Sequence, residues 1–501
     1  MTGDGLLAAR PHVDIPTYDR DALLPSVVHI SVGGFSRAHQ LLYFDELAQR
    51  RISNDWGVVG VGLHSREMRD ALAPQNYLYV VVERDAQGDR ARVVGSLTGY
   101  LFAPEDPEAV LARLADAGTR LVTLTITGNG YRIDPQTGRF DPDDAEVQRD
   151  LRHPRRPGGA LGYLVEALDR RRRSGVPPFT VLSCDNMPHN GMATRTAVVG
   201  FARLRDEVLA RWIADTVAFP SSMVDRITPQ TTADERVAVA TVFGVRDRWP
   251  VITEPFSQWV VEDDFCNVRP PLDHVGVRYV SDVAPYELMK TRLLNASHCA
   301  LGYLGHLAGY LHTHEVVADP VFRAYTARLM DEEISPLLPV VAGVDLADYR
   351  FTLLERFANP AIGDRLERLC GRGSTKMPSY LLPSLRRAVQ EGRPYALLAL
   401  AVAGWFRYLQ RVDHSGDPVE IHDLRGPELQ ALALAGGQDP RPLLAERSVF
   451  GDLGRDRGFV EVLAEALRRF ERDGVRATVA DYVSGPFPAA GITCDTSGET
   501  A

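Results

Sequence analysis

The N-terminal half of the chain alternates short apolar runs with segments whose apolar positions repeat at helical spacing. The run at 27–32 (VVHISV) has almost no polar face and predicts a strand buried on both sides. Further strands are predicted at 57–62, 77–83, 91–96, 121–127, 179–183, 237–243 and 251–253, and helices from 37 and at 108–117, 160–173 and 191–217. Strands that alternate with helices predict a doubly wound, mostly parallel sheet.

The pattern changes after about residue 285. Long amphipathic stretches follow, with few segments typical of strands, at 286–313, 320–336, 346–357, 378–410, 427–436 and 457–474. A charged, proline-containing stretch at 133–158 predicts a surface excursion. Because 501 residues suit two large domains, we predict an α/β domain over 1–284 and a mostly α-helical domain over 285–501.

A glycine turn follows the first predicted strand. Strand, glycine turn and helix form the arrangement in which a Rossmann-type domain holds the pyrophosphate of a dinucleotide. Gly33 is present, but Ser31 stands where a first glycine is expected, and Ala38 lies near the third. We predict a Rossmann-type N-terminal domain whose turn binds the cofactor through Val32, Gly33, Gly34 and Phe35. A tight turn without a ligand is the alternative.

The end of the second strand bears on the choice of cofactor. An acidic residue usually binds the ribose hydroxyl there, but this chain has His64, Ser65 and Arg66. His64 or Ser65 can hydrogen-bond the ribose of NAD. Arg66 can pair with a 2′-phosphate, which leaves NADP open beside NAD.

Basic residues are almost all arginine. Of the 56 basic residues only Lys290 and Lys376 are lysines, which leaves 56 − 2 = 54 arginines. Codon bias explains the arginines but not the two exceptions. A buried lysine can lose its proton and act as a base, whereas arginine stays protonated. The two lysines are therefore candidates for chemistry, and chance survival is the alternative.

The densest polar cluster surrounds Lys290. On a regular helix, Asn295 lies about 140° and His298 about 80° from Lys290, so all three can face one cleft. Alcohol oxidation needs a base for the hydroxyl proton and donors for the alkoxide. Lys290 and Asn295 fit these roles, and Asn186 follows a predicted core strand at its carboxyl end. The alternative is that each of these polar residues only makes hydrogen bonds within the protein core and has no catalytic role.

Two other oxidoreductase classes fit less well. Tyr286 and Lys290 have the YxxxK spacing of short-chain dehydrogenases, but they lie far from the glycine turn in a chain about twice as long. The second class is the zinc alcohol dehydrogenases. The chain has four histidines close together, at 298, 306, 312 and 314, but no HExxH motif and no cysteine at ligand spacing, so we predict no metal site.

Other partners and compartments follow from composition. A net charge of -10 argues against nucleic acid, and no apolar run reaches the ~20 residues of a membrane span. The N-terminal segment lacks the pattern of a signal peptide. Five scattered cysteines predict free thiols: Cys184, Cys266, Cys299, Cys370 and Cys494. We expect a cytoplasmic protein that can function as a monomer and has no nucleic acid or membrane partner.

The chain resembles the polyol-specific long-chain dehydrogenase/reductases, and within them the mannitol 2-dehydrogenases. Matching segments occur in order along nearly the whole chain: VGGFSRAHQ (32–40), DWGVVGVGL (55–63), TLTIT..GY (123–131), SCDNMPHNG (183–191), MVDRITP (223–229), YELMKTRLLNASH (286–298) and 368–378. The Lys-x4-Asn-x2-His pattern is specific, whereas the glycine turn is not. In the family's usual pattern a glycine replaces Ser31, a histidine Ser36 and a glutamate Gly128.

The resemblance implies a metal-independent, NAD(P)-dependent and reversible oxidation of a sugar alcohol to a ketose, such as mannitol to fructose. It implies Lys290 as base, Asn186 and Asn295 on the oxyanion, and Glu287 on a proton path. His298, Asp225, Arg368 and Lys376 would hold substrate hydroxyls. Two alternatives stay open: a fructuronate (hexuronate) reductase, in which Arg368, Arg372 or Lys376 meets a carboxylate, and a non-catalytic nucleotide or sugar sensor.

Overall fold

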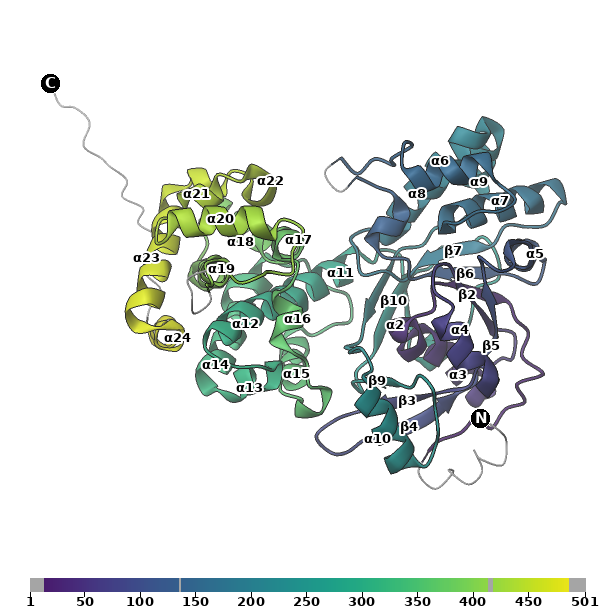
Figure 1. Ribbon diagram of the computed structural model, residues 1–501, viewed down its shortest axis with the longest axis horizontal. Coiled ribbons are helices and arrows are strands. Elements are labelled where there is room, and N and C mark those ends of the chain that lie inside the picture. The colour runs from purple at the N-terminus through teal and green to yellow at the C-terminus, as the bar shows by residue number, and fades with distance from the viewer. Residues whose placement is uncertain (1–12, 135–136, 413–417, 486–501) are drawn as a thin grey trace. The chain divides into compact units, whose positions relative to one another are not determined.

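The computed structural model describes residues 13–134, 137–412 and 418–485, and Cys494 lies outside them. The chain divides into two compact units, Met1–Glu287 and Leu288–Ala501. The first combines sheets with helices and the second is helical (Figure 1). The predicted fold class, a Rossmann-type α/β domain followed by a mostly α-helical one, is confirmed.

The first unit is built on a parallel sheet of five strands in the order β5-β2-β1-β6-β7. Two three-stranded sheets accompany it, β11-β10-β8 and β4-β3-β9. The strands are β1 (Val27–Ile30), β2 (Val58–Gly62), β3 (Tyr79–Glu83), β4 (Arg90–Val94), β5 (Leu97–Phe102), β6 (Leu121–Leu124), β7 (Thr180–Ser183), β8 (Ser222–Asp225), β9 (Val251–Thr253), β10 (Gln258–Glu262) and β11 (Arg278–Val280).

The helices of the first unit cover both faces of the five-stranded sheet, apart from α10, which packs against the sheet β4-β3-β9. They are α2 (Gly34–Ala38), α3 (Gln40–Gln49), α4 (Glu67–Leu72), α5 (Pro107–Ala115), α6 (Ala145–Arg152), α7 (Ala160–Arg173), α8 (Asn190–Arg205), α9 (Glu207–Thr216) and α10 (Ala233–Phe243). One core joins the sheet to α5, α7, α8 and α9, which lie together in Figure 1. A second core joins the five-stranded sheet to α3 and to Val224 and Trp259 of the sheet β11-β10-β8. Burial on both faces explains the continuous apolar runs.

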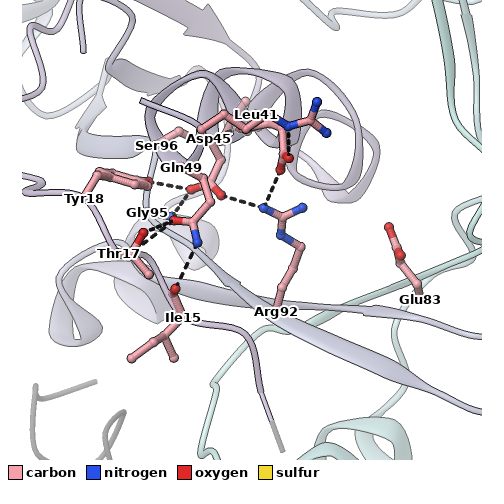
Figure 2. A network of polar contacts seen from close by, with 12 residues as sticks. Ile15, Thr17, Tyr18, Leu41, Asp45, Gln49, Glu83, Arg92, Gly95 and Ser96 are labelled. Carbon is pink, nitrogen blue, oxygen red and sulfur yellow. Dashed lines mark hydrogen bonds and ion pairs between the residues drawn. The ribbon is translucent and has the colours of Figure 1, made fainter. Parts of the chain in front are cut away.

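A buried carboxylate ties the N-terminal segment to this core. Asp45 of α3 accepts hydrogen bonds from Tyr18 Oη (2.5 Å) and the Gly95 N–H (2.7 Å), and pairs with Arg92 at 3.1 Å (Figure 2). Burial raises the pKa of Asp45, while Arg92 and the two donors oppose that shift. A buried charge with several partners is expensive to disturb, so this network has a structural role.

The second unit is an assembly of helices around α19. They are α11 (Ala284–Lys290, which begins in the first unit), α12 (Ala296–Leu307), α13 (Thr313–Ala318), α14 (Pro320–Arg328), α15 (Leu346–Phe357), α16 (Leu366–Cys370), α17 (Gly373–Tyr380), α18 (Leu382–Gln390), α19 (Ala396–Leu409), α20 (Gly426–Gly436), α21 (Arg441–Leu444), α22 (Arg447–Phe450), α23 (Arg457–Asp473) and α24 (Val475–Ser484). Thirteen of the 14 residues of α19 are buried, so it forms the centre of the unit.

Several predicted elements were wrong. The strand predicted at 237–243 belongs to helix α10, because Thr232 and Glu235 form a capping box that outweighs a β-branched run. The helix predicted at 191–217 is two helices, separated at Asp206, whose side chain caps α9. The surface excursion predicted at 133–158 includes a helix, α6, that was not predicted. The stretch 286–313 is one irregular helix up to Leu307, followed by α13, whereas 378–410 divides between α17, α18 and α19.

Candidate active site

The glycine turn after β1 has the backbone that a dinucleotide turn requires. Ser31 has φ of +70°, in the left-handed region that glycine favours. Its N–H donates to the Val61 carbonyl at 2.8 Å, and its carbonyl accepts from Thr125 Oγ1 at 2.8 Å. The family's usual glycine at this position is thus explained by conformation, and serine adopts it here.

The turn is also open to a ligand. A Cβ added to Gly33 would meet no atom within 4 Å, and one on Gly34 would reach only the Thr228 methyl at 4.0 Å. Ser36 Oγ accepts from the Gly33 N–H at 3.0 Å. Arg37, fully buried, donates from Nε to the Gly33 carbonyl at 3.2 Å. The residues at 32–35 therefore fit a bound pyrophosphate.

The edge beyond β2 is exposed. His64, Ser65 and Arg66 all lie at the surface, and Arg66 Nε pairs with Asp70 at 2.8 Å. Ser65 Oγ accepts from the Glu67 N–H at 3.2 Å. Two acidic residues thus follow Arg66 on α4, and one of them already engages its guanidinium. This arrangement suits a ribose hydroxyl better than a 2′-phosphate.

A strained loop follows β6. Thr127 has φ 64° and ψ 162°, a conformation that residues other than glycine rarely adopt. The buried Asp185, just after β7, holds it by accepting from the Ile126 N–H (3.0 Å), the Thr127 N–H (2.9 Å) and Tyr131 Oη (2.7 Å). Burial raises the pKa of Asp185 against these three donors. Asp185 directly precedes Asn186 in the chain, but its role was not predicted from the sequence.

Asn186 and its neighbours lie at the carboxyl end of the parallel sheet, where such folds bind ligands. Asn186 is exposed, and Asn190 connects this loop to β8 by donating to the Asp185 and Ser222 carbonyls at 3.0 and 2.8 Å. The His189 N–H donates to Glu287 at 3.2 Å. Glu287 therefore lies beside the loop that carries Asn186.

Asp225 ends β8 and is 4% exposed. The next residue, Arg226, is also buried and donates to the Ala38 carbonyl at 2.7 Å and to the Glu254 carbonyl at 3.0 Å. It pairs with Glu83 at 2.5 Å. A guanidinium that holds the end of α2 thus follows Asp225 directly, a connection that no pattern in the sequence revealed.

In the second unit, the Lys290 cluster lies on a continuous but irregular helix. Lys290 ends α11 and is 6% exposed, and Asn295 is 8% exposed. The segment between them, η4 (Thr291–Asn295), is a π-helix, so the angles of a regular helix do not apply there. Such segments often occur at functional sites. Among the described residues, no acceptor lies within hydrogen-bonding distance of Asn295 Nδ2, although that donor is buried.

Three further predicted residues gather in the second unit. The His298 ring lies 4.6 Å from the Phe357 ring, centroid to centroid. Lys376 Nζ donates to the Arg368 and Leu369 carbonyls at 2.9 and 3.0 Å. Burial lowers the pKa of Lys376.

Within the described residues, no group of three or more His, Cys, Asp and Glu side chains is arranged as metal ligands would be. No helix there combines the length and the apolar character needed to cross a membrane.

Two family models match the chain: "Mannitol dehydrogenase Rossmann domain" over residues 25–274 and "Mannitol dehydrogenase C-terminal domain" over 282–471. A mannitol 2-dehydrogenase of Aspergillus fumigatus is 47% identical over 481 residues, which are 94% of this chain and 96% of that protein. Mannitol dehydrogenase 2 of Saccharomyces cerevisiae is 47% identical over 475 residues, 94% of each chain.

Two solved structures are similar along almost the whole length. The Pseudomonas fluorescens mannitol 2-dehydrogenase ternary complex with NAD and D-mannitol has a TM-score of 0.87 at 41% identity, covering 97% of this chain and 100% of that one. A D-sorbitol dehydrogenase in substrate-free form has a TM-score of 0.88 at 35% identity, covering 96% and 100%. The chain therefore belongs to the mannitol dehydrogenase family and is a polyol oxidoreductase of the Rossmann type.

Proposed function

We propose that this chain catalyses the reversible, NAD-dependent oxidation of mannitol to fructose. The observation that carries this proposal is a buried amide donor, Asn295 Nδ2, which has no partner among the described residues and lies five residues after the buried Lys290. A buried donor without an acceptor is costly unless a ligand supplies one. An alkoxide formed during the reaction is such an acceptor.

The chain's own residues handle the proton. Oxidation removes a hydride from carbon and a proton from its hydroxyl, which gives the ketone. Bound NAD supplies the hydride acceptor, held at the turn formed by Val32, Gly33, Gly34 and Phe35. Lys290 accepts the hydroxyl proton as its neutral amine, and Asn295 and Asn186 donate hydrogen bonds to the oxygen.

The remaining predicted residues bind or relay. His298, Asp225, Arg368 and Lys376 hold the other hydroxyls of the polyol, and Glu287 passes the proton from Lys290 to solvent. Glu287 accepts from the His189 N–H, in the loop that carries Asn186, which supports a role beside the reacting oxygen. His64 and Ser65 contact the ribose. Since Asp70 engages Arg66, NAD is preferred to NADP.

We also propose a cytoplasmic, monomeric enzyme whose partner is the small-molecule polyol or ketose. The four cysteines in the described part of the chain are free, and Cys184, Cys299 and Cys370 are buried. Free thiols suit a reducing compartment. Light scattering of the purified chain tests the monomer: the mass of one chain is expected, and a multiple of it contradicts that part.

A panel of polyols and ketoses with both cofactors tests the reaction. We expect mannitol to be oxidised with NAD and fructose to be reduced with NADH, each at a higher kcat/KM than with NADP or NADPH. Turnover of fructuronate without turnover of fructose would favour the hexuronate reductase. Binding of NADH without turnover of any polyol or ketose would contradict the enzyme and favour the sensor.

A further inference from the structure

A buried carboxylate in the second unit pairs directly with Arg368, one of the residues proposed to bind substrate. Asp364, 8% exposed, accepts from Arg368 Nε at 2.8 Å through Oδ1 and from Arg368 Nη2 at 2.6 Å through Oδ2. This bidentate pairing fixes the plane of the guanidinium as well as its position. Lysine in place of arginine cannot reproduce it.

The backbone holds Asp364 firmly. Its carbonyl accepts from the Thr313 N–H at 2.9 Å and from Thr313 Oγ1 at 3.1 Å. Gly363, just before Asp364, has φ of +59°. Helix α16 begins two residues after Asp364, so Arg368 lies one helical turn beyond that carboxylate. A carboxylate anchored in this way can position a partner that is itself half exposed.

Asp364 also supplies negative charge among several cations. Burial raises its pKa, but the hydrogen bond and charge of Arg368, followed by the charges of His298 and Lys376, outweigh burial and keep the pKa of Asp364 below its usual value. The Lys376 ammonium lies against the carbonyl of Arg368 itself, at 2.9 Å. Three candidates for substrate binding therefore share the field of one carboxylate.

We propose that Asp364 is a positioning and specificity-determining residue of the substrate site. It orients Arg368 toward a hydroxyl, and its charge offsets part of the positive charge of Arg368 and Lys376, so that a neutral polyol or ketose is preferred to a hexuronate. This inference rests on the proposed function, in which Arg368 and Lys376 contact substrate. Without Asp364 the same cluster would carry more positive charge and favour a carboxylate.

The Asp364→Asn variant tests both parts. It keeps the size of the side chain but removes its charge and one acceptor. We expect the KM for fructose to rise about tenfold with a smaller change in kcat, because binding is affected more than chemistry. We also expect the ratio of kcat/KM for fructuronate to that for fructose to rise about tenfold, since one charge is lost near a partly solvated site.

Asp319→Asn is the matched control. Asp319 is in the same unit, has a side chain 7% exposed, and pairs with Arg476 through both oxygens at 2.6 and 3.2 Å. Its loss should lower stability without changing either KM or the ratio between substrates. Equal shifts in both variants would overturn the inference and indicate a general structural effect.

Two more variants cover the other outcomes. Asp364→Glu should restore the wild-type ratio. Arg368→Lys keeps both charges, so it should raise the KM for fructose several-fold and leave the ratio unchanged, and it remains informative if Asp364→Asn fails to fold. An active wild type whose ratio does not change in folded Asp364→Asn overturns this inference alone. A wild type that uses neither mannitol nor fructose overturns the proposed function and this inference with it.

Discussion

At the level of single residues, Lys290 differs from the arginines around it because an amine can give up its proton near neutral pH and a guanidinium cannot. The residue is 6% exposed, and its proposed role as a base requires the neutral amine. Its proposed role therefore depends on its chemistry more than on its charge, and two substitutions separate these properties.

Lys290→Ala should lower kcat by a factor of about 10² to 10⁴, the usual contribution of a general base. Lys290→Arg should be nearly as poor, because it keeps a positive charge that does not dissociate. NADH binding, followed by fluorescence titration, should change little in either variant. Turnover by Lys290→Arg close to that of the wild type would contradict a role in proton transfer.

Ser31 is a second residue whose backbone matters more than its side chain. At φ of +70°, a residue with a Cβ is strained by about 1 kcal/mol or slightly more. Ser31→Gly should therefore keep activity and unfold at an equal or higher urea concentration. Ser31→Val, with a branched side chain, should lose more than 1 kcal/mol of stability and bind NADH more weakly. Equal stability of the glycine and valine variants would exclude backbone strain.

At the level of elements, helix α19 is the centre of the second unit and is capped from a distance. Its own N-cap residue, Tyr395, makes no capping bond through its side chain. Glu333, from the π-helix η5 (Leu329–Ile334), accepts from the Leu397 and Leu398 N–H groups at 2.9 and 2.8 Å. This carboxylate satisfies two of the donors that every helix leaves free at its start.

The cap should make stability depend on pH. Burial raises the pKa of Glu333 to about 7 from 4.5, although the two N–H groups lower it. Between these values the folded chain binds more protons than the unfolded chain, so the free energy of unfolding falls as pH rises from about 4.5 to 7. The change is on the order of 3 kcal/mol.

Glu333→Gln cannot titrate and should lack this component. Urea unfolding at pH 5 and at pH 8 should therefore show the wild type losing stability relative to Glu333→Gln as the pH rises. Asp319→Asn, which removes a different buried carboxylate charge in the same unit, should not reproduce that change. The same pH dependence in wild type and Glu333→Gln would contradict the shifted pKa.

At the level of the whole molecule, a chain with 56 basic residues has only two lysines, of which Lys290 is buried and Lys376 is half-buried. Acylation with an amine-specific reagent, read by mass spectrometry, should modify Lys290 and Lys376 far more slowly in the folded chain than in urea. NADH together with a polyol should slow modification of Lys290 further. Rapid labelling of Lys290 in the folded chain would place it at the surface and contradict its role.

Much of this architecture was predictable from local patterns. Continuous apolar runs predicted β1 and β7, and regular helical spacing predicted α7 and α15 with their ends. The strands β5, β8, β10 and β11 were missed, because they lack a continuous apolar run and are defined by pairing with other segments more than by composition. For α10, the capping residues Thr232 and Glu235 were a usable signal that the apolar run obscured.

In the candidate site too, some residues could be predicted from the sequence and others could not. Lys290, Asn295 and His298 could be found in the sequence because they lie within nine consecutive residues. The scarcity of lysine marked Lys376, and the resemblance to a family supplied its role together with Asp225 and Arg368. Their supports could not be found, since Asp185 meets Thr127, Arg226 meets Ala38 and Asp364 meets Thr313 only after folding. Residue types and local periodicity thus specify the elements and the reacting groups. The hydrogen bonds that orient those groups join segments distant in the chain, and only the folded structure brings such segments together.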